Sequence, residues 1–213
     1  MIVILLLVNK RREREMFHTY KHNGSDKTLV LFHGTGGDEN SLVHLAQEAA
    51  PHMNHLALRG DVVSYGQRRF AKVKDSNDIL DWEDMLERVP QIQKIIKTLK
   101  VRYKLNELWA LGFSNGANAI ASILLDGEPM FEKAILLRPM EPQIKTKENH
   151  LNNMEILIHS GINDHVIPYK YAIDLETHLI NNGGNVTHKS YDLDHRMRAF
   201  EIQDLKEWFD KHK

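Results

Sequence analysis

Short apolar runs alternate with amphipathic stretches along most of the chain. The runs are almost continuously apolar, which is typical of parallel strands that are covered on both faces. They predict buried strands at 28–32, 55–58, 107–111, 133–137 and 155–159. Two less apolar runs predict a short edge strand at 17–22 and a last strand at 185–191.

The stretches between these runs carry apolar residues at helical spacing. They predict helices over 41–50, 80–104, 117–125, 169–182 and 197–211. We expect Asp38 or Asn40 to cap the first helix, and Pro90 to kink or split the second. Because strands and helices alternate, the pattern predicts an α/β fold: a doubly wound, mostly parallel sheet of about six or seven strands with helices on both faces.

One long stretch, 59–78, has no clear period and is predicted to be a loop. A loop of this length in a compact domain is usually functional, although a solvated surface excursion explains it equally well. No insertion is long enough to form a cap domain. The length of 213 residues suits one domain, which we place at 16–213.

Residues 1–15 differ from the rest of the chain. Positions 1–8 are apolar and 10–14 are mostly basic. The apolar part is too short to cross a bilayer, and a signal peptide would carry its positive charge before the apolar part. We interpret the segment as an N-terminal extension of uncertain role or an extra edge strand. A weak membrane-surface anchor and an upstream start-codon artefact are the alternatives.

Composition and charge exclude several classes of function. The net charge is −1, so no global field favours nucleic acid or an anionic membrane. The chain has no cysteine, which excludes disulfides and a cysteine nucleophile. It has 13 histidines, but no H-E-x-x-H motif of a zinc-binding helix. We therefore expect no metal and a cytoplasmic protein.

The strongest motif follows the strand at 107–111. Gly112-Phe113-Ser114-Asn115-Gly116 reads G-x-S-x-G and leads into a helix of small residues. Strand, sharp turn and helix are the context of a nucleophile elbow, which exposes a serine hydroxyl above a sheet. The two glycines leave room where strand and helix crowd the turn. The alternative is a chance motif on an ordinary turn.

A glycine-rich loop ends the strand at 28–32. Its residues are His33-Gly34-Thr35-Gly36-Gly37. The loop lacks the lysine of the phosphate-binding motif G-x-x-x-x-G-K-[ST], and it does not match G-x-G-x-x-G either. We therefore interpret the loop as part of an oxyanion hole, with the backbone N–H of Thr35 as its main donor. His33 is expected to pack at the strand end rather than act as a base.

A serine nucleophile needs a base, and the base needs an acid to orient it. In enzymes with this turn the chain order is serine, acid, histidine. His195 follows the last predicted strand and lies in a turn-like loop, so it fits the base. Three other histidines fit less well, because they lie in a predicted strand, in a helix or near the terminus: His188, His178 and His212.

Asp164 is the best candidate for the acid. It lies just past the strand at 155–159, where a carboxylate could reach the histidine. Asp192 and Asp194 are rivals, but they are too close in sequence to His195 to face its Nδ1 easily. His165 is expected at the surface or behind the site.

Together these segments resemble a known family. The loop at 33–37, the elbow at 112–116, Asp164-His165-Val166-Ile167-Pro168 and Asp194-His195 look like the small carboxylesterase/phospholipase branch of the α/β-hydrolases, which includes acyl-protein thioesterases. The Arg59-Gly60 pair fits bacterial members of that branch. The resemblance covers about residues 25–211. Many relatives have glycine where this chain has Asp194.

The resemblance implies a mechanism. Ser114 attacks an ester or thioester carbonyl, with His195 as base and then acid, and Asp164 fixes the imidazole tautomer. The backbone N–H groups of Thr35 and Asn115 hold the oxyanion, and water releases the acyl group. No metal or organic cofactor is required.

The surroundings of the site are expected to set its specificity. Tyr65, Phe70 and Met140 are predicted to form an apolar wall, and Arg68 or Arg69 to favour anionic groups, although solvent-facing arginines are an equal alternative. The predicted function is a serine carboxylesterase for small acyl or aryl esters, as a monomer or homodimer without stable membrane insertion. The alternatives are a lysophospholipase, an acyl-protein thioesterase, a serine peptidase or a catalytically silent binding protein.

Overall fold

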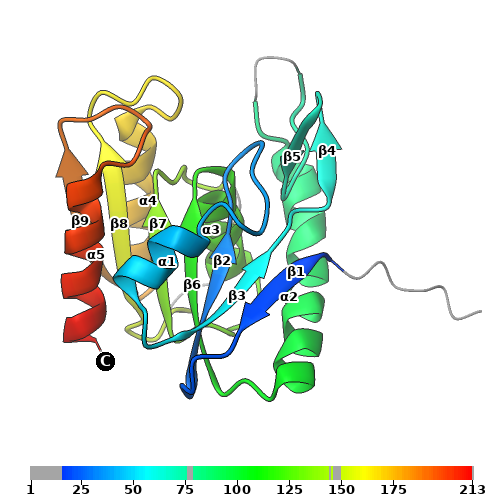
Figure 1. Ribbon diagram of the computed structural model, residues 1–213. Coiled ribbons are helices and arrows are strands. Elements are labelled where there is room, and N and C mark those ends of the chain that lie inside the picture. Colours follow the sequence, from blue (N-terminus) through cyan, green and yellow to red (C-terminus); the bar gives the residue numbers. More distant parts are fainter. Residues whose placement is uncertain (1–15, 76–78, 144, 146–149, 213) are drawn as a thin grey trace, which may run out of the picture.

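The computed structural model describes residues 16–75, 79–143, 145 and 150–212 (Figure 1). The predicted extension at 1–15 lies outside these residues. The central sheet has seven strands in the order β1-β3-β2-β6-β7-β8-β9. Their bounds are β1 (His18–Lys21), β2 (Lys27–Phe32), β3 (Asn54–Leu58), β6 (Glu107–Phe113), β7 (Lys133–Leu137), β8 (Glu155–Gly161) and β9 (Asn185–Tyr191).

Every neighbouring pair in this sheet is parallel except the edge pair β1–β3. Because the strands are parallel, their carboxyl ends meet at one edge of the sheet, where α/β folds place ligands. The helices between them are α1 (Val43–Ala49), α2 (Trp82–Tyr103), α3 (Asn115–Asp126), α4 (Tyr169–Asn181) and α5 (Ala199–Lys211). The predicted α/β class and the mostly parallel sheet are confirmed, and the described residues include no cap domain.

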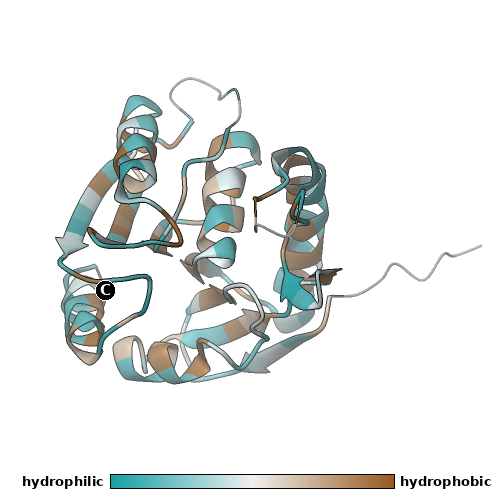
Figure 2. Cartoon of the chain, turned by 90° about the horizontal axis from the view of Figure 1, so that it is seen from above, coloured by the Kyte–Doolittle hydropathy of each residue, from teal (hydrophilic) through white to brown (hydrophobic). Residues whose placement is uncertain are grey.

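The sheet separates two apolar cores. Successive residues of a strand point to opposite faces, so Val30 and Phe32 of β2 enter one core while Leu29 and Leu31 enter the other. Helices α2, α3 and α4 cover the first core, and α1 and α5 cover the second. Seen from above, the helices lie in two layers around the sheet (Figure 2).

Helix α3 is the most deeply buried helix. All of its residues from Asn115 to Leu125 are buried, including the polar residues Asn115, Asn118 and Ser122. The small residues at its start allow close packing on β2: a Cβ placed at Gly116 would lie 2.1 Å from the carbonyl oxygen of Phe32. This approach fixes the position of the elbow relative to the neighbouring strand.

The predicted loop at 59–78 contains regular structure in its described part, 59–75. It contains a two-stranded hairpin, β4 (Val62–Ser64) and β5 (Gln67–Arg69). Tyr65 and Gly66 form its two-residue turn with φ of 49° and 73°, which is the conformation of a type I′ turn. The prediction of a loop was wrong because Tyr-Gly is a weaker turn signal than Asn-Gly.

Two further expectations about helices need correction. α2 is not split at Pro90 but runs unbroken from Trp82 to Tyr103; Pro90 is exposed, whereas the adjacent Val89 is buried in the core. A kink at Pro90 stays a prediction. α1 begins at Val43 after Leu42, without a side-chain cap. Asp38 instead accepts the N–H of Asn40 at 2.9 Å, which makes a tight turn before the helix.

None of the helices in the described ranges combines the length and the apolar character that a membrane span would need.

Gly116→Ala tests the close approach of α3 to β2. The added Cβ meets backbone rather than a flexible side chain, so we expect the free energy of unfolding to fall by about 3 kcal/mol or more. Urea unfolding followed by circular dichroism measures this. The control Ala121→Gly changes one methyl group in the same helix and should cost only about 1–2 kcal/mol. Equal effects of the two substitutions would contradict the proposed packing.

Candidate active site

The predicted elbow is present at the carboxyl end of β6. Ser114 has φ 51° and ψ −117°, a conformation that L-residues rarely adopt and that costs roughly 1–3 kcal/mol. Its N–H donates to the carbonyl of Leu137 in β7 at 2.8 Å, and its own carbonyl accepts from the N–H of Asn118 at 2.9 Å. The turn is therefore held by the next strand and by the first turn of α3.

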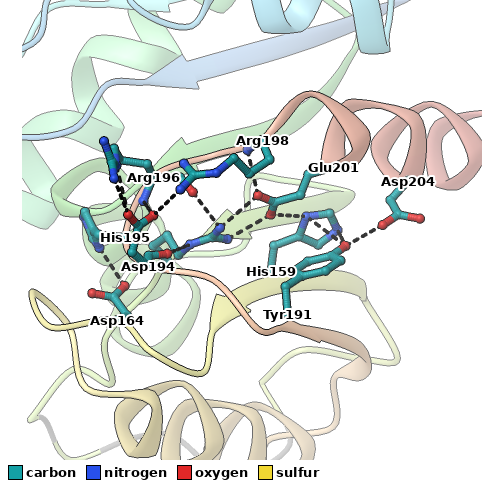
Figure 3. A network of polar contacts seen from close by, with 10 residues as sticks. His159, Asp164, Tyr191, Asp194, His195, Arg196, Arg198, Glu201 and Asp204 are labelled. Carbon is teal, nitrogen blue, oxygen red and sulfur yellow. Dashed lines mark hydrogen bonds and ion pairs between the residues drawn. The ribbon is translucent and has the colours of Figure 1, made fainter.

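His195 and Asp164 lie next to this serine. The hydroxyl of Ser114 is 3.0 Å from His195 Nε2, and His195 Nδ1 is 2.7 Å from Asp164 Oδ2. Figure 3 shows His195 and Asp164 facing each other. A carboxylate only accepts hydrogen bonds, so Nδ1 carries the imidazole proton and Nε2 is free to accept the serine proton. The structure thus brings together the three residues that the sequence selects.

The Asp164 carboxylate is held in its charged form. Burial disfavours the charge, but the hydrogen bond from His195 and those from the N–H groups of Ile167 and Val166, both 2.8 Å, outweigh it. The pKa of Asp164 is therefore lowered. The two backbone donors also fix the carboxylate, because they bind Oδ1 and leave Oδ2 for the histidine.

The rival residues are engaged elsewhere. Asp192 accepts from the side chain of Asn163. His188 Nε2 is 2.6 Å from the hydroxyl of Ser160, and its Nδ1 is 2.7 Å from Glu176 Oε2. This serine, histidine and glutamate repeat the order of a catalytic relay. Ser160 is only 3% exposed, however, and is not among the residues that line the cavity at Ser114.

The loop at 33–37 is shaped by its first residue. His33 is buried, its Nδ1 lies 2.6 Å from the carbonyl of Gly34, and its Nε2 accepts the N–H of Gly60 at 3.0 Å. Burial lowers the pKa of His33, so the ring is neutral with its proton on Nδ1. The expectation that His33 packs at the strand end is confirmed.

Thr35 and Asn115 both line the cavity beside Ser114. Within the described part of the chain, neither backbone N–H has a protein acceptor. The Thr35 hydroxyl accepts from Arg69 at 2.9 Å, which holds the loop against the hairpin. The assignment of these two N–H groups to an oxyanion hole stays a prediction.

Two asparagine side chains connect the elbow to neighbouring loops, which sequence reasoning missed. Asn115 Oδ1 accepts the N–H of Phe70, and Asn118 Oδ1 accepts the N–H of Met140, both at 2.7 Å. Asn115 lies inside the G-x-S-x-G motif, so its position was known, but nothing in the sequence shows the partner of its side chain.

Ser114 opens into a cavity of about 640 Å³. Of the predicted wall residues, Arg69 and Met140 line it. Tyr65 does not: it sits at the hairpin turn and is 63% exposed. Phe70 does not either, because its ring is fully buried against Phe32 and His33. The cavity is lined instead by residues that the sequence did not predict as wall residues, among them Val73, Ile79, Leu80, Trp82, Ile167 and Tyr171.

Arg68 and Asp194, which the sequence analysis also discussed, are not among the residues that line the cavity. Arg68 donates to the carbonyl of Gly60 at 3.1 Å. Asp194 binds the side chains of Arg196 and Arg198 (Figure 3). The hydrogen bonds from Arg196 lower the pKa of Asp194 to about 2, so the residue before His195 remains charged at neutral pH.

Among the described residues, no group of three or more His, Asp or Glu side chains is placed to hold a metal ion.

The comparisons agree with this geometry. A family model described as Phospholipase/Carboxylesterase matches residues 19–213. The structure is similar to the Bacillus cereus carboxylesterase, with a TM-score of 0.88 and 30% identity over 94% of this chain and 96% of that chain. The sequence is 29% identical over 196 residues to the Bacillus subtilis (strain 168) protein MhqD, whose name assigns it to the hydrolases; the match covers 91% of this chain and 98% of MhqD.

A more distant structure shares the fold. The Zea mays acyl-protein thioesterase 2 has a TM-score of 0.75 and 20% identity, over 92% of this chain and 98% of that chain. Fold and comparisons together define an α/β-hydrolase. The chain belongs to the phospholipase/carboxylesterase family, and it is an esterase-type hydrolase.

Asp164→Asn tests the electrostatics of the acid. A lowered folded-state pKa means that ionised Asp164 stabilises the protein above the unfolded-state value of about 3.9. This contribution is lost as the pH falls through the lower folded-state pKa. We therefore expect the variant to be less stable than wild type at pH 6, with a difference that shrinks below about pH 4. Urea unfolding at several pH values measures it. A difference independent of pH would contradict the assignment.

Proposed function

We propose that this hydrolase is a serine carboxylesterase that cleaves small acyl or aryl esters through an acyl-enzyme on Ser114. One observation carries the proposal. The Ser114 hydroxyl, His195 and Asp164 form a continuous hydrogen-bonded relay of 3.0 and 2.7 Å at the wall of an open cavity. A serine hydroxyl is a weak nucleophile, and a base in contact with it supplies the activation it needs.

The proposed reaction has two halves. Ser114 Oγ bonds to the ester carbonyl carbon while its proton moves to His195 Nε2. The carbonyl oxygen becomes an oxyanion, which the N–H groups of Thr35 and Asn115 stabilise; one such donor is worth about two to three orders of magnitude in rate. The carbon–oxygen bond to the leaving group then breaks, and His195 returns the proton to the departing alkoxide or phenoxide.

Water completes the cycle. It gives a proton to His195 and attacks the acyl carbon, and the acid leaves as Ser114 recovers its proton. Asp164 keeps its charge throughout and favours the imidazolium that forms in both halves. Helix α3 begins at the elbow, and the positive end of its dipole further favours the oxyanion.

The cavity supports a small substrate. Its volume of about 640 Å³ lies within the usual range for small-molecule sites. Apolar side chains including Leu80, Trp82 and Met140 line it and suit an acyl or aryl group. Arg69, Lys74 and Glu141 add charges of both signs, so the lining does not demand a charged substrate.

Ser114→Ala tests the nucleophile. With p-nitrophenyl acetate, we expect kcat to fall by at least about four orders of magnitude, because attack through Ser114 is lost. The matched control is Ser160→Ala, which removes the serine of the other Ser–His–Glu relay and should leave kcat within a few-fold of wild type. Intact mass after fluorophosphonate treatment should show one adduct on wild type and none on Ser114→Ala. Labelling that survives in Ser114→Ala would exclude the proposed nucleophile.

A panel of p-nitrophenyl esters tests the substrate class. We expect kcat/KM to be highest for short acyl chains and to fall from acetate and butyrate toward palmitate, because Arg69, Lys74 and Glu141 interrupt the apolar lining and a long chain would cover these charges. Lysophospholipid and palmitoyl thioester substrates complete the panel. A clear preference for either of these would replace the small-ester proposal by lysophospholipase or thioesterase activity while retaining the same mechanism.

A further inference from the structure

Arg138 is an unusual residue at the carboxyl end of β7. It has φ 53°, and its side chain is only 1% exposed. Arginine is almost never fully buried unless its charge is paired. A left-handed backbone and a buried guanidinium together indicate that surrounding contacts hold this residue in place.

The guanidinium binds both sides of the histidine loop. It donates to Glu201 through Nη1 and Nη2, each at 2.9 Å. Nη2 also donates to the carbonyl of Arg196 at 3.1 Å, and Nε lies 3.3 Å from the carbonyl of Asp194. These carbonyls belong to the residues immediately before and after His195. The planar guanidinium of Arg138 therefore holds the backbone on both sides of the proposed base, His195.

The backbone of the same segment contacts the other two parts of the site. Arg138 N–H donates to the carbonyl of His159 at 2.7 Å, which ties it to β8, the strand that leads to Asp164. The carbonyl of Leu137, its neighbour in sequence, accepts the N–H of Ser114 at 2.8 Å. The segment 137–138 thus connects the elbow, the strand of the acid and the loop of the base.

Glu201 orients the guanidinium of Arg138. It lies in the first turn of α5, is fully buried, and also accepts the N–H of Arg198 at 3.0 Å. Figure 3 shows Glu201 between this loop and the His159–Tyr191 pair. Burial disfavours its charge, but hydrogen bonds from His159 and Arg138 outweigh this and lower the pKa of Glu201.

We propose that Arg138, oriented by Glu201, is a positioning residue that sets the place of His195 relative to Ser114 and Asp164. The proposal rests on the proposed function, because it assumes that His195 acts as the base. A buried ion pair contributes little net stability, since desolvation of both charges offsets their attraction. The contacts to two carbonyls around His195 give the pair a role beyond stability.

The double variant Arg138→Met/Glu201→Met separates positioning from folding. It removes both charges and keeps similar side-chain volumes, a change that is often neutral for stability. We expect a folded protein with near-native thermal unfolding, kcat lower by about 100-fold and KM unchanged, because a misplacement of about 1 Å has that effect on rate. Arg88→Met, which removes an arginine of α2 from its pairs with Asp84 and Asp61, is the control and should retain kcat.

Two further measurements complete the test. Arg138→Lys keeps the positive charge opposite Glu201, but its ammonium group cannot bridge both carbonyls. We therefore expect kcat to fall at least 10-fold with KM unchanged. If the double variant does not fold, this single variant tests the positioning role of Arg138. Proton NMR should show the downfield Nδ1 signal of His195 weakened in these variants, while that of His188, bonded to Glu176, stays. A folded double variant or Arg138→Lys with wild-type kcat would overturn the proposal. Absence of Ser114-dependent turnover in wild type would instead refute the proposed function.

Discussion

The site depends on one backbone constraint, the left-handed turn at Ser114. The N–H of Ser114 is bound to β7, and α3 begins at once behind it, with Gly116 packed against the backbone of β2. A serine in an ordinary turn could swing its hydroxyl through several rotamers and positions. Here the two strands and the buried helix fix its Cα. The hydroxyl is therefore held close to His195, with Oγ 3.0 Å from Nε2.

Hydrogen bonds of the protein place every other part of the site around that turn. Neutral His33 holds the loop of Thr35, two backbone N–H groups hold Asp164, and Asn115 and Asn118 connect the elbow to the segments at 70 and 140. The arrangement therefore exists before a substrate binds. Groups that are already oriented need not reorganise as charge develops, which is the main source of electrostatic stabilisation in such sites.

The sequence predicts this arrangement where the chemistry is local. The elbow, the glycine loop and the positions of Asp164 and His195 after strands are visible because turn residues and strand ends have short signatures. Sequence reasoning fails where a side chain is defined by distant partners. Tyr65 and Phe70 are both aromatic residues in a polar stretch, and the sequence does not distinguish them. Tyr65 is exposed at a hairpin turn, whereas Phe70 is buried against His33.

Arg138 illustrates the same limit. In the sequence it begins a loop with two prolines, and nothing near it shows that its partners lie some 60 residues away in α5 and the histidine loop. Buried ion pairs of this kind follow from tertiary packing rather than from a local sequence pattern. The same is true of α2, which continues unbroken through Pro90. The exposed position of Pro90 cannot be known before the helix is placed on the sheet.

A crystal structure of the protein after reaction with diethyl p-nitrophenyl phosphate tests the central claim most directly. The phosphoryl group would stand in for the tetrahedral intermediate. The account predicts a covalent bond to Ser114 Oγ, with one phosphoryl oxygen within hydrogen-bond distance of the N–H groups of both Thr35 and Asn115. An adduct on another residue, or a phosphoryl oxygen directed away from these two groups, would contradict it.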